Sequence, residues 1–490
     1  MSVLQRTTLR VLSVVATLLA LAACSQLPAR ASPPGTRADE PIVLASCSVV
    51  GLDGSARCGV AHVFEDRRTR RGRSIALRIV IVPARVPGTQ REPLVFLAGG
   101  PGQAATDLVG DVAEGLAQAG ATRDLLFIDQ RGTGHDSPLR CNLLARDGDL
   151  DHLASGALPE ARLQACLTTM DANPRLYTTP MAMEDLDEVL DRLGYRGQVN
   201  LIGGSYGTYA AQVFAHLYPA RVRALVLDGV VPTNADYPLR FAERSQRAFD
   251  QVVDECAHDV ACRAAFPDPR RDLALGQARL REHPVILKTA RASVAFDADA
   301  FSMFVRSLLG SPDGRGLVPA VVRAAAAGEY DAFGAAVIDG QFGVLESQSV
   351  GMYLTVNCTE VLPRATMEDT ERLARGTFLG VARAGPMLRA CAIWPRGVDV
   401  AALHERLRSD VPALLLSGTV DNATSLDDAR GVAAALPHAQ SVVVLGGGHT
   451  VGGTPCIDGV IARFIEKPFA PVDASCIRPI ATPFAKAFPP

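Results

Sequence analysis

The chain has 490 residues, of which 48% are hydrophobic and 21% are charged, and its formal net charge is −3. This composition supplies a large core and lacks the polar bias of disordered chains. A net charge this close to zero excludes the strongly basic surface that phosphate backbones require, so we expect no nucleic-acid partner. The length allows one large domain with an insertion, or two to three domains.

Residues 1–23 are typical of an export signal, because positive charge precedes a nearly all-apolar stretch at residues 11–23. That stretch is shorter than the roughly 20 residues that span a bilayer. Residues 21–24, Leu-Ala-Ala-Cys, resemble the lipobox of bacterial lipoproteins, which predicts a lipoprotein-type signal peptide and Cys24 as the lipid anchor to a membrane of the cell envelope. Ser25 favours the periplasmic face of the outer membrane if the cell has two membranes. An ordinary signal peptide is the alternative.

The segment 24–45 carries the lipid cysteine and a proline-rich stretch without helical or strand periodicity, which predicts a flexible tether. Ten further cysteines form an even number, as disulfides in an exported protein require. We predict pairing between sequence neighbours: Cys47/Cys58, Cys141/Cys166, Cys256/Cys262, Cys358/Cys391 and Cys456/Cys476. The sequence does not fix this connectivity, because ten cysteines allow about 945 pairings. Buried free thiols are the alternative.

Short apolar runs followed by glycine or a charged residue predict strands of a mostly parallel sheet, and apolar residues at helical spacing predict helices between them. The runs are 75–82, 94–97, 125–128, 199–202, 224–227, 413–416 and 442–445; the helical stretches are 183–193, 206–217 and 457–465. Alternating strands and helices indicate an α/β fold. Residues 232–396 are instead rich in alanine and arginine at helical spacing. We therefore predict a core formed by 46–231 and 397–490, interrupted by a helical cap.

Residues 203–207, Gly-Gly-Ser-Tyr-Gly, fit the pattern G-x-S-x-G between a predicted strand and a predicted helix. In this context the pattern is typical of a sharp turn that exposes a nucleophilic serine at the edge of a sheet. Ser205 then needs a general base and an acid that orients the base. Asp421 and His449 each follow a later predicted strand and give the chain order Ser, Asp, His. Asp228 is the main rival for the orienting acid.

The glycine-rich stretch 98–102 follows the run 94–97. A loop at this position brings a backbone N–H toward the nucleophile, so we assign the oxyanion hole to the N–H groups of Gly100 and Tyr206. A phosphate-binding loop is the competing interpretation, but the lysine and Ser/Thr of a P-loop are absent from this stretch. The sequence shows no metal-binding motif, and we expect neither a metal nor a cofactor.

Taken together, three motifs resemble the α/β-hydrolase peptidases that include prolyl aminopeptidases and tripeptidyl aminopeptidases. They are 99–102 (Gly-Gly-Pro-Gly), 129–134 (Asp-Gln-Arg-Gly-Thr-Gly) and 203–207. The stretches 357–360 and 391–395 and the final Asp421/His449 module are similar to the tripeptidyl aminopeptidase branch. The resemblance covers about residues 46–480.

The resemblance implies an α/β-hydrolase fold and a serine exopeptidase that releases residues from a free N-terminus through an acyl-enzyme, with short peptides as substrates. Ser205 is then the nucleophile, His449 the base and Asp421 the orienting residue. A carboxylate must read the substrate ammonium group, and we predict Glu360 for this role.

The chain departs from the family pattern at Ala98, where prolyl aminopeptidases commonly have histidine, and at Asn422-Ala423 after the aspartate. The identity of the substrate therefore stays open. An esterase or lipase that uses the same three residues is the alternative function, and a non-catalytic envelope lipoprotein that binds peptides is a third. The oligomeric state also stays open.

Overall fold

The computed structural model describes residues 40–488 except 53, 87–91, 135, 136, 138, 142–157, 290, 291 and 398–404. The predicted signal peptide and Cys24 lie outside the described residues, as does nearly all of the predicted tether. Within the described part of the chain, no helix has both the length and the apolar character needed to cross a bilayer.

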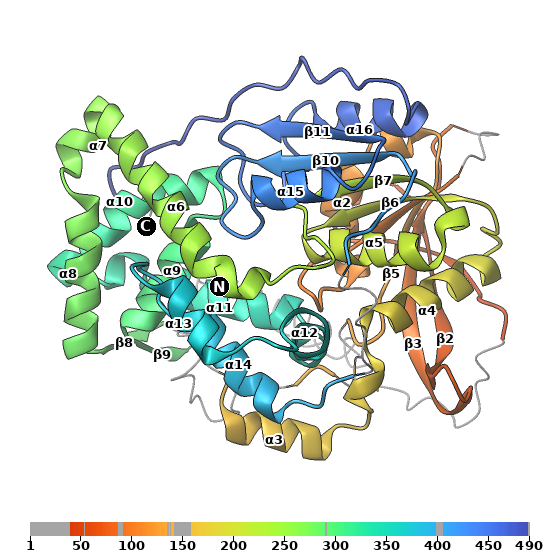
Figure 1. Ribbon diagram of the computed structural model, residues 1–490, viewed down its shortest axis with the longest axis horizontal. Coiled ribbons are helices and arrows are strands. Elements are labelled where there is room, and N and C mark those ends of the chain that lie inside the picture. The colour runs from red at the N-terminus through yellow and green to blue at the C-terminus, as the bar shows by residue number, and fades with distance from the viewer. Residues whose placement is uncertain are drawn as a thin grey trace, which may run out of the picture. The chain divides into compact units, whose positions relative to one another are not determined.

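A nine-stranded sheet forms the centre of the unit that begins at residue 41 (Figure 1). Its strands are β1 (Ala45–Cys47), β2 (Ala56–Asp66), β3 (Arg71–Val82), β4 (Leu94–Leu97), β5 (Leu125–Ile128), β6 (Val199–Gly204), β7 (Val222–Asp228), β10 (Ala413–Gly418) and β11 (Ala439–Val444). Their spatial order is β1-β2-β3-β5-β4-β6-β7-β10-β11. The six strands from β5 to β11 in that order are parallel, whereas β1, β2 and β3 pair antiparallel. The mostly parallel sheet is confirmed, although β3, expected among the parallel strands, is antiparallel to both of its neighbours.

Helices cover both faces of the sheet. They are α2 (Val109–Gly115), α4 (Thr179–Arg192), α5 (Tyr206–Leu217), α15 (Leu426–Ala433) and α16 (Ile457–Glu466), whereas α3 (Glu160–Thr169) packs beside α14 (Ala384–Ile393) of the helical region. Successive strand residues point to opposite faces. Leu201 and Leu225 therefore join the core under α4 and α5, whereas Ile202 and Val226 join the core under α2 and α16. This double burial explains why these strands are continuous apolar runs in the sequence.

Residues 237–393 are mainly helical. They contain α6 (Tyr237–His258), α7 (Val260–Ala265), α8 (Pro269–Glu282), α9 (Ala298–Leu308), α10 (Pro312–Ala327), α11 (Asp331–Ser347), α12 (Val350–Val356), a π-helical turn (Asn357–Val361), α13 (Met367–Ala374) and α14 (Ala384–Ile393). A hairpin of β8 (Val285–Lys288) and β9 (Ser293–Phe296) adds strands that the expected all-helical insertion lacked. In Figure 1 the arrows of β10 and β11 point toward these helices. We call residues 237–393 the cap.

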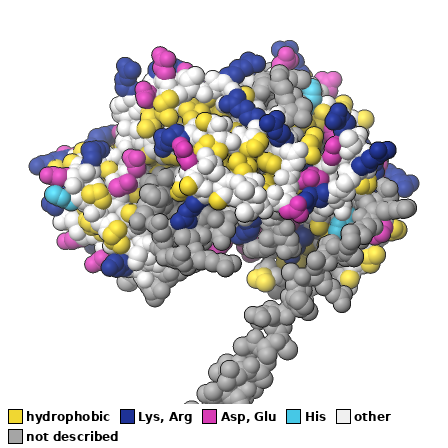
Figure 2. Space-filling view, turned by 90° about the horizontal axis from the view of Figure 1, so that it is seen from below, with side chains coloured by type: hydrophobic (Ala, Val, Ile, Leu, Met, Phe, Trp, Pro, Cys, Tyr) yellow, Lys and Arg dark blue, Asp and Glu magenta, His cyan; other side chains and the backbone are white. Residues whose placement is uncertain are grey.

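All ten described cysteines form disulfides between sequence neighbours. The bridges are Cys47–Cys58, Cys141–Cys166, Cys256–Cys262, Cys358–Cys391 and Cys456–Cys476. The fourth bridge joins the π-helical turn to α14, which brings together the two cap stretches that carried the family resemblance. On the surface, charged side chains of both signs are interspersed over the face seen in Figure 2, in keeping with the small net charge of the chain.

The arginine of the Asp-Gln-Arg-Gly-Thr-Gly motif is a structural residue. Arg131 is fully buried and donates to both carboxylate oxygens of Asp185 in α4, at 2.6 and 2.9 Å. Asp185 also accepts a hydrogen bond from Arg67 at 2.6 Å. This buried ion pair fixes the loop after β5 to α4.

We expect Asp185→Ala to lower the free energy of unfolding by about 3 to 5 kcal/mol, because it leaves the buried Arg131 guanidinium without its anion. Urea unfolding monitored by circular dichroism measures this change. Asp191→Ala on the same helix is the control: Asp191 is 54% exposed in its pair with Arg221, and its loss should cost at most about 1 kcal/mol. Equal effects of the two substitutions would contradict a structural role for the buried pair.

Candidate active site

Ser205 lies on a sharp turn between β6 and α5, with φ 53° and ψ −119°. Two glycines make this turn sterically accessible. A Cβ on Gly203 would lie 2.3 Å from the carbonyl oxygen of Gly207, and a Cβ on Gly207 would lie 2.0 Å from the carbonyl oxygen of Leu97. Any side chain at either position would therefore displace the helix from the strands. The turn is held by a hydrogen bond of 2.8 Å from the Ser205 N–H to the Asp228 carbonyl.

The structure brings Ser205, His449 and Asp421 together from the carboxyl ends of β6, β11 and β10. Nε2 of His449 lies 2.9 Å from the Ser205 hydroxyl oxygen, and Nδ1 lies 2.8 Å from Oδ2 of Asp421. These distances suit a neutral imidazole that donates from Nδ1 to the carboxylate and accepts the serine proton at Nε2. The three side chains thus have the geometry of a nucleophile, a base and an orienting acid.

The electrostatics of the pair favour a charged carboxylate next to the imidazole. Burial alone would raise the pKa of Asp421, but His449 and the hydrogen bonds from Thr424 outweigh burial and lower this pKa below its usual value. Burial opposes protonation of His449, but the Asp421 carboxylate outweighs that effect and raises the pKa of the imidazole above its usual 6.5. Asp421 therefore stabilises the imidazolium that forms when the base takes the serine proton.

Asp228, the rival for the orienting acid, has a different position. Its carboxylate accepts hydrogen bonds from the backbone N–H groups of Val451, at 2.9 Å, and Gly452, at 2.7 Å. Burial raises the pKa of Asp228 to about 6. Asp228 thus fixes the loop that follows His449, while Asp421 contacts the imidazole directly.

Gly100 and Tyr206, the predicted oxyanion-hole residues, both line the same pocket as Ser205. Tyr206 is the first residue of α5, so its N–H has no acceptor within the helix. Gly100 has φ 110°, a conformation that favours glycine. The cap fixes the Gly100 loop, because Gln348 Nε2 donates to the Pro101 carbonyl at 2.6 Å. Both residues thus lie at the pocket that holds the nucleophile, and their role as oxyanion-hole donors stays a prediction.

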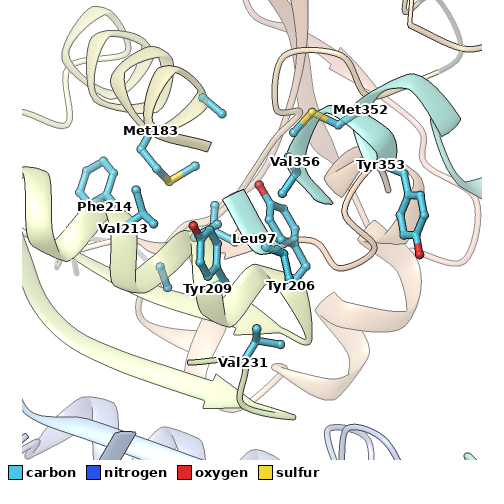
Figure 3. Close-up of a cluster of buried hydrophobic side chains, with 14 of the residues drawn as sticks. Leu97, Met183, Tyr206, Tyr209, Val213, Phe214, Val231, Met352, Tyr353 and Val356 are labelled. Carbon is cyan, nitrogen blue, oxygen red and sulfur yellow. The ribbon is translucent and has the colours of Figure 1, made fainter. Parts of the chain in front are cut away.

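The Tyr206 side chain points away from the pocket into the core. Figure 3 shows Tyr206 and Tyr209 projecting side by side from α5. The Tyr206 hydroxyl lies 2.7 Å from the Thr179 hydroxyl. The side chain therefore anchors α5 to α4 beneath the nucleophile.

Glu360 is not brought into the pocket, which corrects the expectation that it contacts a substrate amine. It is 1% exposed, does not appear among the pocket-lining residues, and its Oε1 accepts a hydrogen bond of 2.6 Å from the Thr179 N–H. Burial raises the pKa of Glu360 to about 7. The carboxyl group lies in the core near Tyr206 and Tyr209. Burial is the main cause that raises the pKa values of these two tyrosines, and the Glu360 carboxylate is the second. Its position is structural.

The pocket has a volume of about 700 Å³, within the usual range for small-molecule sites. The core contributes Ser205, His449 and the Gly99-Gly100 loop to its lining. The cap contributes the following residues: Tyr237, Phe241, Arg306, Gln348, Tyr353 and Arg383.

Within the described residues, no group of three or more His, Cys, Asp or Glu residues is arranged to hold a metal ion.

Sequence reasoning missed the contacts that fix Asp421 and His449. Asp421 accepts from the backbone N–H groups of Ala423 and Thr424, at 2.7 and 2.8 Å, and from the Thr424 hydroxyl at 2.5 Å. Asn422, which marks a departure from the family pattern, donates to the Arg306 carbonyl of α9 at 2.7 Å. Every residue except proline carries a backbone N–H, so the sequence signal of such a turn is the aspartate itself in a loop after a predicted strand.

Comparisons with known proteins agree with this geometry. Residues 92–282 match the alpha/beta hydrolase fold family, and residues 378–476 match the TAP-like protein family. The chain is 30% identical to the serine protease Hip1 of Mycobacterium tuberculosis over 44% of each chain, and 28% identical to tripeptidyl aminopeptidase of Streptomyces lividans over 37% of this chain and 36% of that protein. The matched segments thus span less than half of either relative.

A longer match joins the chain to the putative hydrolase YuaR of Escherichia coli, with 22% identity over 82% of this chain and 83% of that protein. Among solved structures, proline iminopeptidase of Mycobacterium smegmatis aligns with a TM-score of 0.39 and 14% identity over 84% of this chain and 98% of that chain.

The strand order and the first family match define an α/β-hydrolase fold, and the site places a serine, a histidine and an aspartate in hydrogen-bonding order. Its C-terminal part is similar to the TAP-like protein family, and parts of the chain are similar to a serine protease and to a tripeptidyl aminopeptidase.

We expect the reaction of Ser205 with a fluorophosphonate probe to require neutral His449. The labelling rate should therefore rise with pH through a midpoint above 6.5, since Asp421 raises the pKa of the imidazole. Asp421→Asn removes the carboxylate, so the midpoint should move to lower pH and the maximal rate should fall by a factor on the order of 10⁴. Labelling reactions quenched at fixed times and analysed by intact-protein mass spectrometry measure the pH midpoint and the maximal rate.

Asp427→Asn is the matched control, because Asp427 lies in the same segment but its side chain is 74% exposed. This variant should keep the midpoint and rate of the parent protein. An unchanged labelling profile in Asp421→Asn would show that another group orients the imidazole.

Proposed function

We propose that this chain is an aminopeptidase that hydrolyses short peptides from a free N-terminus through an acyl-enzyme intermediate. The observation that carries the proposal is the hydrogen-bonded series Ser205, His449, Asp421 at the edge of a pocket roofed by the cap. The similarity to the serine protease Hip1 and to a tripeptidyl aminopeptidase supports peptides as the substrate class.

The proposed reaction has two halves, the formation of the acyl-enzyme and its hydrolysis, and the same catalytic groups act in both. The Ser205 oxygen attacks the scissile carbonyl carbon while His449 Nε2 takes the serine proton, and the N–H groups of Gly100 and Tyr206 stabilise the oxyanion. His449 then gives the proton to the leaving amine, which departs and leaves an ester on Ser205. A water molecule gives a proton to the same imidazole and attacks the ester, and the imidazole then returns that proton to the Ser205 oxygen as the N-terminal product leaves.

Asp111 is our new candidate for the group that binds the substrate ammonium, in place of Glu360. Among the described residues that line the pocket, the carboxylates are those of Asp111 and Asp228. Asp228 already accepts the backbone N–H groups of Val451 and Gly452. Asp111, in α2, is exposed toward the pocket and is therefore available to pair with a cation.

We further propose that the chain is exported and anchored through a lipid on Cys24. The signal-like segment 1–23 supports this location. The five disulfides also support it, since such bonds persist in oxidising compartments.

We expect Ser205→Ala to lower peptide hydrolysis by a factor on the order of 10⁶, because it removes the nucleophile. The parent enzyme should cleave Ala-Ala-Ala-type peptides and aminoacyl chromogenic amides, and should lose this activity when the amine is acetylated. Mass spectrometry of the products measures both and shows how many residues leave in each cut. Equal cleavage of free and acetylated peptides would contradict an aminopeptidase, and hydrolysis of simple acyl esters alone would indicate an esterase.

We expect Asp111→Asn to raise KM for free-amine peptides about three- to tenfold, in line with the modest strength of an exposed ion pair, and to leave kcat nearly unchanged. Steady-state kinetics on one peptide series measure this split. Glu114→Gln is the control, because Glu114 is exposed on the same helix and does not appear among the residues that line this pocket. A KM that stays constant in Asp111→Asn would assign ammonium binding to another group.

A further inference from the structure

Two arginines of the cap line the pocket and stack on one aromatic ring. The guanidinium carbon of Arg306, in α9, lies 4.4 Å from the centroid of Phe241, and that of Arg383, just before α14, lies 5.7 Å from the same centroid. Arg383 also lies 5.5 Å from the ring of Tyr353 and donates to its hydroxyl at 2.5 Å. The two cations are thus held at one wall of the pocket by α6, α9, α12 and α14.

Both arginine side chains are half-buried, and neither has a carboxylate within 4.0 Å among the described residues. The fully buried arginines of the chain are, by contrast, paired. Arg131 pairs with Asp185, Arg244 with Asp428 and Arg315 with Glu255, at 2.6, 2.7 and 2.9 Å. The Nε atoms of Arg306 and Arg383 are buried and without a hydrogen-bond partner in the described structure, but so are those of Arg244 and Arg315. The missing carboxylate is therefore what distinguishes the two pocket arginines, and since charges withdrawn from water are normally paired, this wall of the pocket lacks an anion.

The nearby acid of the catalytic series does not supply that anion. Both oxygens of Asp421 are occupied: Oδ1 by the N–H groups of Ala423 and Thr424, and Oδ2 by Thr424 and His449. Burial and the positive charge of Arg383 lower the pKa of Arg306 to about 10. An external carboxylate between the two guanidinium groups would offset both the desolvation and the repulsion.

The end of α9 places Arg306 on the imidazole's side of the pocket. The Arg306 carbonyl accepts from Asn422, next to Asp421, and the Gly310 carbonyl accepts from the His449 N–H at 2.8 Å. Because the imidazole gives its proton to the leaving amine, this side of the pocket faces the leaving group. A cation there meets the part of the substrate that follows the scissile bond.

We propose that Arg306 and Arg383 form a subsite for a carboxylate on the leaving group, so that the enzyme prefers peptides with an anion shortly after the scissile bond. This proposal rests on the proposed peptidase function. The carboxylate is either the C-terminus of a short peptide or the side chain of an acidic residue, since both present the same planar anion to a guanidinium.

Matched substrates test the proposal on the parent enzyme. We expect Ala-Ala-Ala-Ala with a free C-terminus to be cleaved with roughly tenfold to hundredfold higher kcat/KM than its C-terminal amide, the range expected for charge-assisted hydrogen bonds. A series of C-terminal amides with Glu, Gln or Ala at each position after the cut separates the two sources. If Glu but not Gln restores the rate, the subsite binds an acidic side chain of the substrate. If neither restores it, the subsite binds the C-terminal carboxylate of the substrate.

Arginine variants then locate the subsite. In Arg306→Gln and Arg383→Gln, the preference for the free acid, measured as the ratio of kcat/KM for the acid to kcat/KM for the amide, should fall at least tenfold. Arg306→Lys and Arg383→Lys should restore part of the preference because they keep the charge. Arg247→Gln, on the same helix as Phe241 but 53% exposed, is the control and should keep the full preference.

A binding measurement keeps this test separate from the peptidase proposal. Trialanine should protect Ser205 from fluorophosphonate labelling at concentrations at least tenfold lower than trialanine amide does. Protection that differs in this way without turnover of any peptide would support the subsite and overturn the peptidase function. Equal protection by the two forms, or equal kcat/KM for the acid and the amide in the parent enzyme, would overturn the subsite even if every arginine variant failed to fold.

Discussion

The active site depends on one backbone contact that leaves no room for a side chain. The Cα of Gly207 faces the Leu97 carbonyl so closely that a Cβ would lie 2.0 Å from its oxygen. This contact allows α5 to begin directly against the end of β4. It thereby places the Ser205 hydroxyl and the Tyr206 N–H beside the Gly99-Gly100 loop, which follows the same strand.

The parallel arrangement of the strands supplies the remaining geometry. Since β6, β10 and β11 run in one direction, their carboxyl ends meet at one edge of the sheet. Ser205 and His449 are 244 residues apart in the chain, yet the Ser205 hydroxyl oxygen lies 2.9 Å from His449 Nε2. The cap completes the site, because its Gly310 and Arg306 carbonyls hold the backbone of His449 and the side chain of Asn422.

The sequence predicted the parts of the fold that one strong local signal defines. The runs at β4 and β5 and the helix α5 have the predicted bounds, because doubly buried strands are continuously apolar and α5 is bounded by the serine turn and Pro219. β2 was not predicted, because its buried positions include a charged residue. Glu65 is buried and accepts a hydrogen bond from the Tyr177 hydroxyl. A buried polar residue hides the period of two that marks a strand.

The site shows the same division. Ser205, Asp421 and His449 follow strands, and their residue types and chain order were visible in the sequence. Glu360 was misplaced because local sequence does not state whether a helical carboxylate points to a cavity or to the core. Arg306 and Arg383 carry no local signal among the many arginines of the cap. Their significance comes from the absence of nearby carboxylates among the described residues, a property of tertiary structure alone.

The disulfides have a consequence for the synthesis of the chain. Each bridge joins consecutive cysteines of the described sequence, with separations from 6 to 33 residues, and no bridge encloses another. In the exported chain that we propose, each of these ten thiols therefore emerges directly before or after its native partner. Oxidation in that order would give the five bridges without reshuffling, so a strong oxidant would suffice and an isomerase would have little to correct.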